Sequence, residues 1–537
     1  MRIKLARILA FIFALSLMVA LTISLGARGP QSQERPLPPR AGLPKGRLPS
    51  DIRTAAPAPS SWFRSYGKFF DTTDTEYDWY ADSQPAWDGG VVVAGSASRI
   101  VTSPRKVIQD MLVMEIGPLG GVAWQVLYEA DPDKDCYNDA EGLTRTRDGG
   151  YLVVGSVSQS PLSESAVLVM KLIPPPEPPD EGKTPYHHYS LGFGPEWVKS
   201  YRFSAQGQGY SYAGNVVETP DGGFVLSGYR SSPNGVSSNW LMKIDPAGNV
   251  VWHEDVALDR LSLIATSDAG FIVAGEADNR VQVVKFDSGG RVQWAKSYEE
   301  KDPGWGCDDY EFTLSSISST ADGGYILAGA TIGCICCDHS RSAEWVCKLD
   351  RDGRIAWSQG YASPGIRSIL QTTDGCYLMT VMEGLVKVDS SGSIQWVKAY
   401  SEVSPQSAFP FDGQGFMVAG SANLAASNYD LRLMVMRVDS GGHINPPCSL
   451  ESDGSATTRN ARVRYVSTSE FKPTENSVLV NVLEYTPFTR TCEVTTICPS
   501  GEDSQSRPSR EPVCPSDDGR SNQNNQNLRG EVHGLFS

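Results

Sequence analysis

The stretch whose residue types are best suited to chemistry is DPDKDCYNDAE, from Asp131 to Glu141. It begins with acidic residues at alternating positions. Its first carboxylates, those of Asp131, Asp133 and Asp135, are hard oxygen ligands of the kind that bind Ca²⁺. The stretch departs from an EF-hand loop because a cysteine occupies the turn position that needs glycine, and because no glutamate closes the loop. Two interpretations stay open: a Ca²⁺ site or a solvated acidic loop. No cofactor is predicted apart from this possible Ca²⁺.

Aromatic residues lie among acids in a second stretch, EEKDPGWGCDDYE, at residues 299–311. Trp305 and Tyr310 present flat rings with polar edges, which suit stacking against a sugar ring or a partner side chain. Tyr137, at the end of the first acidic run, has the same character. We expect these three residues to bind a partner, with the packing of the rings between structural elements as the alternative.

Eleven cysteines form two main groups in the sequence. In an oxidising compartment such groups form disulfides, and the odd number leaves at least one cysteine outside an intramolecular pair. The alternative for the first group is a zinc site that includes His339, although its spacing matches no common zinc pattern. The disulfide candidates are Cys307, Cys334, Cys336 and Cys337 in the first group, and Cys448, Cys492 and Cys498 in the second.

A repeated pattern must position these residues. A D-G-G turn, or a close variant, follows an alternating apolar stretch seven times, and glycine at such turns accepts the positive φ that hairpins require. A strand follows each turn, then a third strand with a Lys or Arg in six of the copies, and often a D-x-x-G turn. The turn aspartates are Asp88, Asp148, Asp221, Asp268, Asp322, Asp374 and Asp412.

Tryptophans on the fourth strand set the number of repeats. Copies one to six each carry one, copy seven carries none, and Trp62 supplies a seventh ahead of the first copy. A tyrosine follows four residues after the tryptophan in six of the seven strands, on the same strand face. We therefore predict an all-β, seven-bladed propeller over residues 61–447, in which residues 61–67 complete the seventh blade. The tryptophans expected to pack between blades are Trp62, Trp124, Trp197, Trp252, Trp294, Trp357 and Trp396.

The repeat, as in residues 320–361, reads T-x-D-G-G-Y-x-x-x-G followed by K-x-D-x-x-G-x-x-x-W-x-x-x-Y. It resembles the tandem propeller repeats of exported, mostly uncharacterised bacterial and archaeal proteins. Its second half is similar to the quinoprotein propeller repeat, which implies a quinone held against a vicinal disulfide, matched here by Cys336 and Cys337. The chain departs from that family in its shorter turn, in its seven repeats rather than eight, and in lacking a matching calcium-ligand set.

The ends of the chain have different compositions. Residues 1–28 begin with basic residues and continue as an uncharged apolar run from Ile8 to Leu25, typical of either a cleaved signal peptide or an N-terminal membrane anchor. Residues 29–60 are a Pro-rich linker. Residues 448–498 alternate like strands and are expected to be a small, disulfide-stapled β addition. Residues 499–537 are polar and expected to be disordered.

The net charge of −15 disfavours nucleic acid as a partner, because an acidic surface repels phosphates. Neither G-x-S-x-G nor H-E-x-x-H is present, so no catalytic residue is predicted. We expect an extracytoplasmic binding or scaffolding propeller, secreted or anchored through residues 8–25, whose long-loop face binds a protein or polysaccharide at the cell surface. The alternative is an exported glycan-cleaving or quinone-dependent enzyme with its site on that face or in the central channel.

Overall fold

The computed structural model describes residues 61–67, 75–102, 105–128, 137–158, 164–173, 195–203, 209–231, 237–300, 310–333, 341–362, 365–413, 415–423, 431–444, 451–454, 457–459, 463–465, 474–475, 479–482 and 493–498. The chain divides into two units, Met1–Ala56 and Pro57–Ser537, and all the described residues belong to the second. These residues form only strands, turns and bends. No helix in the described ranges is long and apolar enough to span a membrane.

The first two repeats share one nine-stranded sheet, in which a single parallel bridge between Gln109 and Tyr137 joins them. Within each repeat, successive strands pair antiparallel. The first repeat comprises β2 (Thr75–Pro85), β3 (Val91–Thr102), β4 (Arg105–Ile116) and β5 (Val122–Tyr128). The second comprises β6 (Tyr137–Arg145), β7 (Tyr151–Ser158), β8 (Ser165–Leu172) and β9 (Pro195–Arg202).

The third to sixth repeats each form their own sheet of four consecutive antiparallel strands with one added strand. The third comprises β10 (Tyr210–Glu218), β11 (Phe224–Ser231), β12 (Ser237–Ile244) and β13 (Val250–Val256), and the fourth β14 (Asp259–Ala265), β15 (Phe271–Ala277), β16 (Arg280–Phe286) and β17 (Val292–Glu300). The fifth comprises β18 (Tyr310–Ser319), β19 (Tyr325–Gly333), β20 (Arg341–Leu349) and β21 (Ile355–Ala362), and the sixth β22 (Ile366–Gln371), β23 (Tyr377–Val381), β24 (Gly384–Val388) and β25 (Ile394–Tyr400).

The last sheet combines both ends of the repeat region. It contains β26 (Val403–Phe411), β27 (Gly415–Asn423) and β28 (Leu431–Asp439), and β1 (Trp62–Gly67) pairs antiparallel with β28. Trp62 lies opposite Arg437, and Tyr66 lies opposite Leu433. The N-terminal strand thus occupies the place of the fourth strand that the seventh repeat lacks in sequence.

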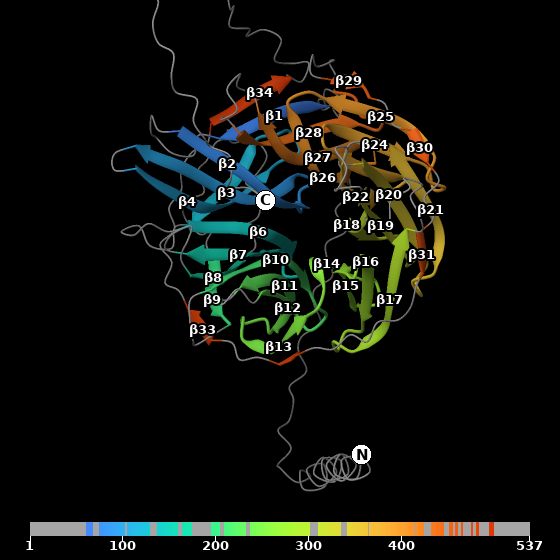
Figure 1. The fold of residues 1–537 in the computed structure, drawn as a ribbon. Helices are drawn as coiled ribbons and strands as arrows, with labels where there is room; N and C mark the ends of the chain where they lie inside the picture. Colours follow the sequence, from blue (N-terminus) through green and yellow to red (C-terminus); the bar gives the residue numbers. More distant parts are fainter. Residues whose placement is uncertain are drawn as a thin grey trace, which may run out of the picture. The chain divides into compact units, whose positions relative to one another are not determined.

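Figure 1 shows the result as a propeller-like arrangement within this unit: the first strand of each repeat lies near a common centre and the fourth lies at the periphery. The apolar clusters lie between neighbouring repeats, because each strand alternates its side chains between two faces. One cluster packs Trp62 and Leu433 of the last sheet against Val93 and Leu112 of the first repeat. The last sheet and the first repeat therefore share a core.

The described C-terminal strands add to the outer edges of the sheets. They pair with the outer strands of successive sheets in reverse order, from the sixth repeat back to the second, and finally with β1 (Figure 1). A single strand can pair in this way because each outer strand otherwise presents unpaired backbone groups. These strands are β29 (Glu451–Asp453), β30 (Thr457–Arg459), β31 (Val463–Tyr465), β32 (Thr474–Glu475), β33 (Leu479–Val482) and β34 (Glu493–Cys498).

Candidate functional site

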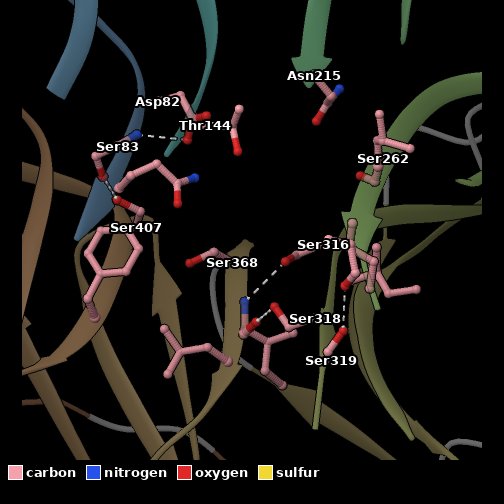
Figure 2. A pocket seen from close by; sticks show the side chains of 18 of the residues that line it. Asp82, Ser83, Thr144, Asn215, Ser262, Ser316, Ser318, Ser319, Ser368 and Ser407 are labelled. Atoms are coloured by element: carbon pink, nitrogen blue, oxygen red, sulfur yellow. Dashed lines mark hydrogen bonds between the residues drawn. The ribbon is translucent and has the colours of Figure 1, made fainter. Parts of the chain in front are cut away.

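A cavity of about 620 Å³ lies where the first strands of the repeats meet. All seven first strands, β2, β6, β10, β14, β18, β22 and β26, contribute to its wall. Figure 2 shows Asp82, Asn215 and Ser316 on different sides of one open space. The cavity is therefore a property of the whole set of repeats and of no single one.

A β-bulge recurs in each first strand and explains which side chains reach this space. In every repeat the pairing of the first and second strands shifts register at one point, and such a shift re-aims the side chains around it. The residue that resumes the pairing is polar in six repeats, and those six line the cavity. The seven residues are Asp82, Gly142, Asn215, Ser262, Ser316, Ser368 and Ser407; we call the six polar ones the polar ring.

Among the described residues that line the cavity, Asp82 is the only titratable one. Its carboxylate accepts backbone N–H bonds from Ser83 at 2.7 Å and from Leu143 of the second repeat at 2.9 Å. Burial nevertheless raises the pKa of Asp82 to about 7, because desolvation outweighs the two hydrogen bonds. Near neutral pH this carboxyl therefore exchanges a proton readily.

Hydroxyl groups connect the last sheet to the first repeat beside Asp82. The Ser407 hydroxyl lies 2.7 Å from the Tyr80 hydroxyl and 2.5 Å from the Ser83 hydroxyl, and Figure 2 shows the Ser83 contact. Burial raises the pKa of Tyr80 well above its usual range, so its hydroxyl stays protonated. This side of the cavity is consequently rich in hydrogen-bonding groups.

A second group of polar side chains lies on the same inner strands, before or within the bulges. On β6, Tyr137, Asp139 and Glu141 share the solvent-accessible face, because alternate residues point the same way. On β10, Tyr210 and Tyr212 do the same. We call these five residues, together with Tyr229 of β11, the acidic tyrosine face.

Close approach of the backbones brings β6 and β10 together. A side chain at Gly142 would place its Cβ only 2.6 Å from the carbonyl oxygen of Gly214, so glycine is required at residue 142. The rings of Tyr210 and Tyr212 lie 5.7 Å apart, and those of Tyr212 and Tyr229 lie 6.0 Å apart. Tyr210 is 40% exposed, which leaves the outer end of this tyrosine series open.

The two carboxyl groups of the face are perturbed by their surroundings. Asp139 accepts hydrogen bonds from the Ser96 hydroxyl at 2.9 Å and from the Gln109 amide, but desolvation still raises its pKa. Glu141 is accessible to solvent, yet surrounding protein displaces much of its water and Asp139 adds repulsion, so its pKa rises to about 7. Both carboxyls raise the pKa of Tyr210 further, beyond the larger effect of its burial, to about 12.

Glu115 occupies the third-strand position where most repeats have lysine. Its carboxylate accepts hydrogen bonds from the Trp124 indole at 3.0 Å and the Tyr151 hydroxyl at 3.2 Å. Burial, reinforced by repulsion from Asp88, raises the pKa of Glu115 to about 7. The first repeat therefore has a buried carboxyl group where most other repeats have a lysine that pairs with the turn aspartate.

In the second to sixth repeats the third-strand lysine binds the turn aspartate. Lys243 donates to Asp221 at 2.8 Å, and the equivalent Lys–Asp pairs measure 2.5 to 2.9 Å in the second, fourth, fifth and sixth repeats. The Thr219 hydroxyl and the Gly223 N–H also donate to Asp221. These residues fix the turn, and the geometry gives them no substrate-facing role.

The tryptophans of the fourth strands pack against the next repeat. The ring of Trp197 lies against Gly248, in the turn before the fourth strand of the third repeat, and four residues on the Tyr201 hydroxyl donates to the Gly248 carbonyl at 2.7 Å. Trp62 and Tyr66 make the same contacts with Gly120 of the first repeat. Corresponding ring contacts involve Trp252, Trp294, Trp357 and Trp396. Trp124 is buried and packs against Tyr151 of the second repeat.

Several sequence-predicted site residues lie outside the described residues: Asp131, Asp133, Asp135, Trp305, Cys307, Cys334, Cys336, Cys337, Cys448 and Cys492. Cys498 lies on β34 and Tyr310 begins β18, and of these two residues the backbone alone is described. Tyr137 joins the acidic tyrosine face. Cys347 is a buried free thiol and Cys376 a half-buried one. The described part of the chain contains no group of three His, Cys, Asp or Glu side chains able to hold a metal ion.

Sequence reasoning missed the polar ring and most of the acidic tyrosine face. A signal for the ring was present: the ring position precedes the turn aspartate by six residues in six repeats and by five in the seventh. The sequence pattern predicts an acidic loop that includes Asp139 and Glu141, whereas both residues lie on β6. Tyr210, Tyr212 and Tyr229 carry no repeat signal, and only the packing of β6 against β10 brings them together.

No family model and no curated protein matches the chain. Among solved structures, polysaccharide lyase Uly1 is 8% identical with a TM-score of 0.37, over 70% of this chain and 97% of that one. An α-L-arabinanase of Penicillium chrysogenum complexed with arabinobiose is 10% identical with a TM-score of 0.35, over 71% and 99%. A protein of unknown function from Bacteroides caccae is 13% identical with a TM-score of 0.31, over 55% and 92%. At these values the similarities assign no activity.

Proposed function

We propose that this protein is an extracytoplasmic, seven-bladed β-propeller that binds a glycan at its acidic tyrosine face. The blade number rests on seven recurring sets of strands, the last of which includes β1. Closure of the ring between the last and first blades is supported by the core that Trp62 shares with Val93, and by the Tyr66 hydrogen bond to Gly120 at 2.8 Å. The extracytoplasmic location rests on the apolar run from Ile8 to Leu25.

The observation that carries the ligand assignment is the series of three tyrosine rings beside two carboxyl groups. Aromatic faces pack against the apolar faces of sugar rings, while their hydroxyls supply directional hydrogen bonds. Carboxylates such as those of Asp139 and Glu141 accept hydrogen bonds from sugar hydroxyls. The spacings of 5.7 and 6.0 Å between the tyrosine rings extend this surface beyond a single ring.

A neutral glycan fits the charges better than other partner classes. The net charge of −15 and the unneutralised carboxyls of the face repel polyanions, including nucleic acids and acidic polysaccharides. A glycan with free hydroxyls satisfies carboxylates without introducing charge. A cationic protein surface is the remaining competitor, and high salt distinguishes the two, because salt weakens ion pairs far more than neutral hydrogen bonds.

A glycan array followed by titration calorimetry tests the proposal. Retention of neutral glycans that persists at 0.5 M salt supports it, and Tyr212→Ala should weaken that binding at least tenfold. Trp87→Ala is the matched control, because Trp87 is 52% exposed and lies in the turn that follows β2, outside the acidic tyrosine face. Binding that no face substitution alters, or retention of no neutral glycan, rejects the assignment.

Catalysis is the second candidate, favoured by two carboxyls with raised pKa on one strand face. Incubation of each retained glycan with the full chain, followed by mass analysis of the products, decides between binding and cleavage. Shortened products that disappear in Glu141→Gln indicate an enzyme. Intact glycan after prolonged incubation leaves binding as the function.

A further inference from the structure

The cavity at the centre of the first strands forms a site separate from the acidic tyrosine face. The face uses residues before or within the bulges, such as Asp139 and Tyr212, whereas the cavity uses residues after them, such as Thr144 and Asn215. A polar residue recurs at the ring position in six repeats, whereas the residues of the acidic tyrosine face do not recur. A ligand of the cavity would thus be contacted from several sides at once.

The wall of the cavity is rich in small hydroxyl groups. Serines supply hydroxyls from the first, fourth, fifth, sixth and seventh repeats, and Thr144 and Asn215 contribute from the second and third (Figure 2). Side chains this short leave the centre of the channel open, whereas larger apolar residues at the same positions would fill it. A volume of about 620 Å³ lies within the range of pockets that hold small organic ligands.

The charges of the wall narrow the ligand class. The described part of the wall contains no lysine, arginine or histidine, so it offers an anion no cationic partner. A divalent cation would find a single carboxyl, that of Asp82, which already accepts two backbone N–H bonds. Hydroxyl and amide groups both donate and accept hydrogen bonds, and this suits a neutral ligand with hydroxyls around its edge.

Some of this hydrogen-bonding capacity is unused. No hydrogen bond of the Ser262 hydroxyl is found among the described residues, and that of Thr144 makes only a long 3.4 Å contact with the Arg145 carbonyl. Ser316 and Ser407, in contrast, bond to neighbouring repeats and are held in place. The wall therefore combines fixed groups with groups that remain available to a ligand.

We propose that the central cavity binds a small neutral polyol, such as a monosaccharide or cyclitol, through the polar ring. This site is independent of glycan binding at the acidic tyrosine face. A ligand there would bridge several repeats, so it would also stabilise the folded chain in proportion to its concentration.

Titration calorimetry of the full chain with glucose, arabinose and myo-inositol tests the proposal, with glucosamine and gluconate as charged probes. At least one neutral polyol should bind saturably, and the charged probes at least tenfold more weakly. Ser262→Leu, which replaces a hydroxyl of the cavity wall with a bulkier apolar side chain, should weaken polyol binding at least tenfold, while Tyr212→Ala leaves it within twofold. Absence of saturable binding by all three polyols means that the cavity holds only water and overturns the proposal.

A second measurement covers the case in which Ser262→Leu fails to fold. In Ser262→Cys the new thiol can be alkylated and followed by peptide mass spectrometry, with the half-buried thiol of Cys376, outside the cavity wall, as an internal control. A bound polyol should slow the alkylation of residue 262 at least fivefold and leave that of Cys376 unchanged. Equal rates with and without a polyol that binds in calorimetry would place the ligand elsewhere and reject the cavity as its site.

Discussion

The surroundings lower the pKa of the carboxyl groups in the repeated turns, as at Asp221. They raise the pKa of the carboxyl groups on the inner strands of the first two repeats, as at Asp82 and Glu141. At Asp221 partial burial opposes ionisation, but hydrogen bonds from Lys243, Thr219 and Gly223 lower its pKa to about 2. At Asp82 and Glu141 desolvation raises the pKa to about 7 in both cases. No cationic group contributes to those two shifts.

The difference separates residues that hold the repeats together from residues that are open to a ligand. A lysine on the third strand neutralises the turn aspartate in five repeats, so the charge stabilises the turn each time. The interior carboxyls ionise at a cost to stability, which is a feature of functional sites. Recurrence in sequence therefore marks the framework, and unneutralised charge marks the surface where we place function.

The largest expected effect concerns the framework at β1. Trp62 is 1% exposed, and its indole donates to the Pro118 carbonyl at 3.1 Å. Trp62→Ala should therefore reduce the free energy of unfolding by about 3–5 kcal/mol, measured by denaturant titration. Trp87→Ala, at the exposed tryptophan over which Arg145 stacks, should cost less than about 1 kcal/mol. Equal effects of the two substitutions would remove β1 from the framework.

The next effect separates the two sets of carboxyls directly. Lys243→Met leaves the exposed Asp221 without its cation, so unfolding should become easier by about 1 kcal/mol at pH 7. The same change should raise the pKa of Asp221 toward its ordinary value, observable by NMR titration of the side chain. An unchanged pKa in the variant would show that Thr219 and the backbone alone stabilise the charge.

The pH dependence of stability should have two limbs. A lowered pKa, as at Asp221, gives stability that is present above the ordinary value of about 3.9 and is lost as the pH falls toward 2. A raised pKa, as at Glu115, gives a cost that is absent below about 4.3 and grows as the pH rises through 7. From these groups we expect maximum stability near pH 4–5. Glu115→Gln should flatten the neutral limb, and thermal melts between pH 2 and 8 measure both.

The smallest effect tests the turn itself. Ala269 has a φ of 67°, a left-handed conformation that glycine adopts at the equivalent position in the other D-G-G turns. Ala269→Gly should stabilise the chain by about 1 kcal/mol, because the alanine strain is relieved. Gly323→Ala is the mirror control: its φ is 78° and nothing lies within 4 Å of the added Cβ, so any loss is conformational. Opposite signs in denaturant titrations are the expected result.

The sequence predicts the strands and turns of the repeats well because each repeat contains the same short-range signals. Asp-Gly turns, alternating strands and the Trp–Tyr spacing are short-range signals, and the strands, turns and all-β architecture follow them. The pairing of β1 with β28 also follows, since the seventh repeat lacks a fourth strand and Trp62 begins one. The prediction of Tyr137 as a binding residue stays a prediction, although the structure places it beside Asp139.

The C-terminal strands and the inner surface lie beyond such local rules. Residues such as Val480 alternate like any strand, and nothing in their pattern states that the partner is Tyr201 on the edge of a distant repeat. The acidic run before Asp139 and Glu141 predicts a loop, yet both residues lie on β6, which pairs with β7. Long-range pairing decides both cases, because a strand's register depends on its partner.

The sequence by itself determined the repeat, its turns and the missing fourth strand at Trp62, because backbone geometry and residue spacing are local properties. Only the tertiary structure decided what the repeats enclose. Six of the seven bulges turn Asp82, Asn215 and four serines toward one cavity, and the close approach of Gly142 to Gly214 sets tyrosines beside Glu141. Those neighbours are far apart in sequence, and their proximity and altered pKa values arise from packing.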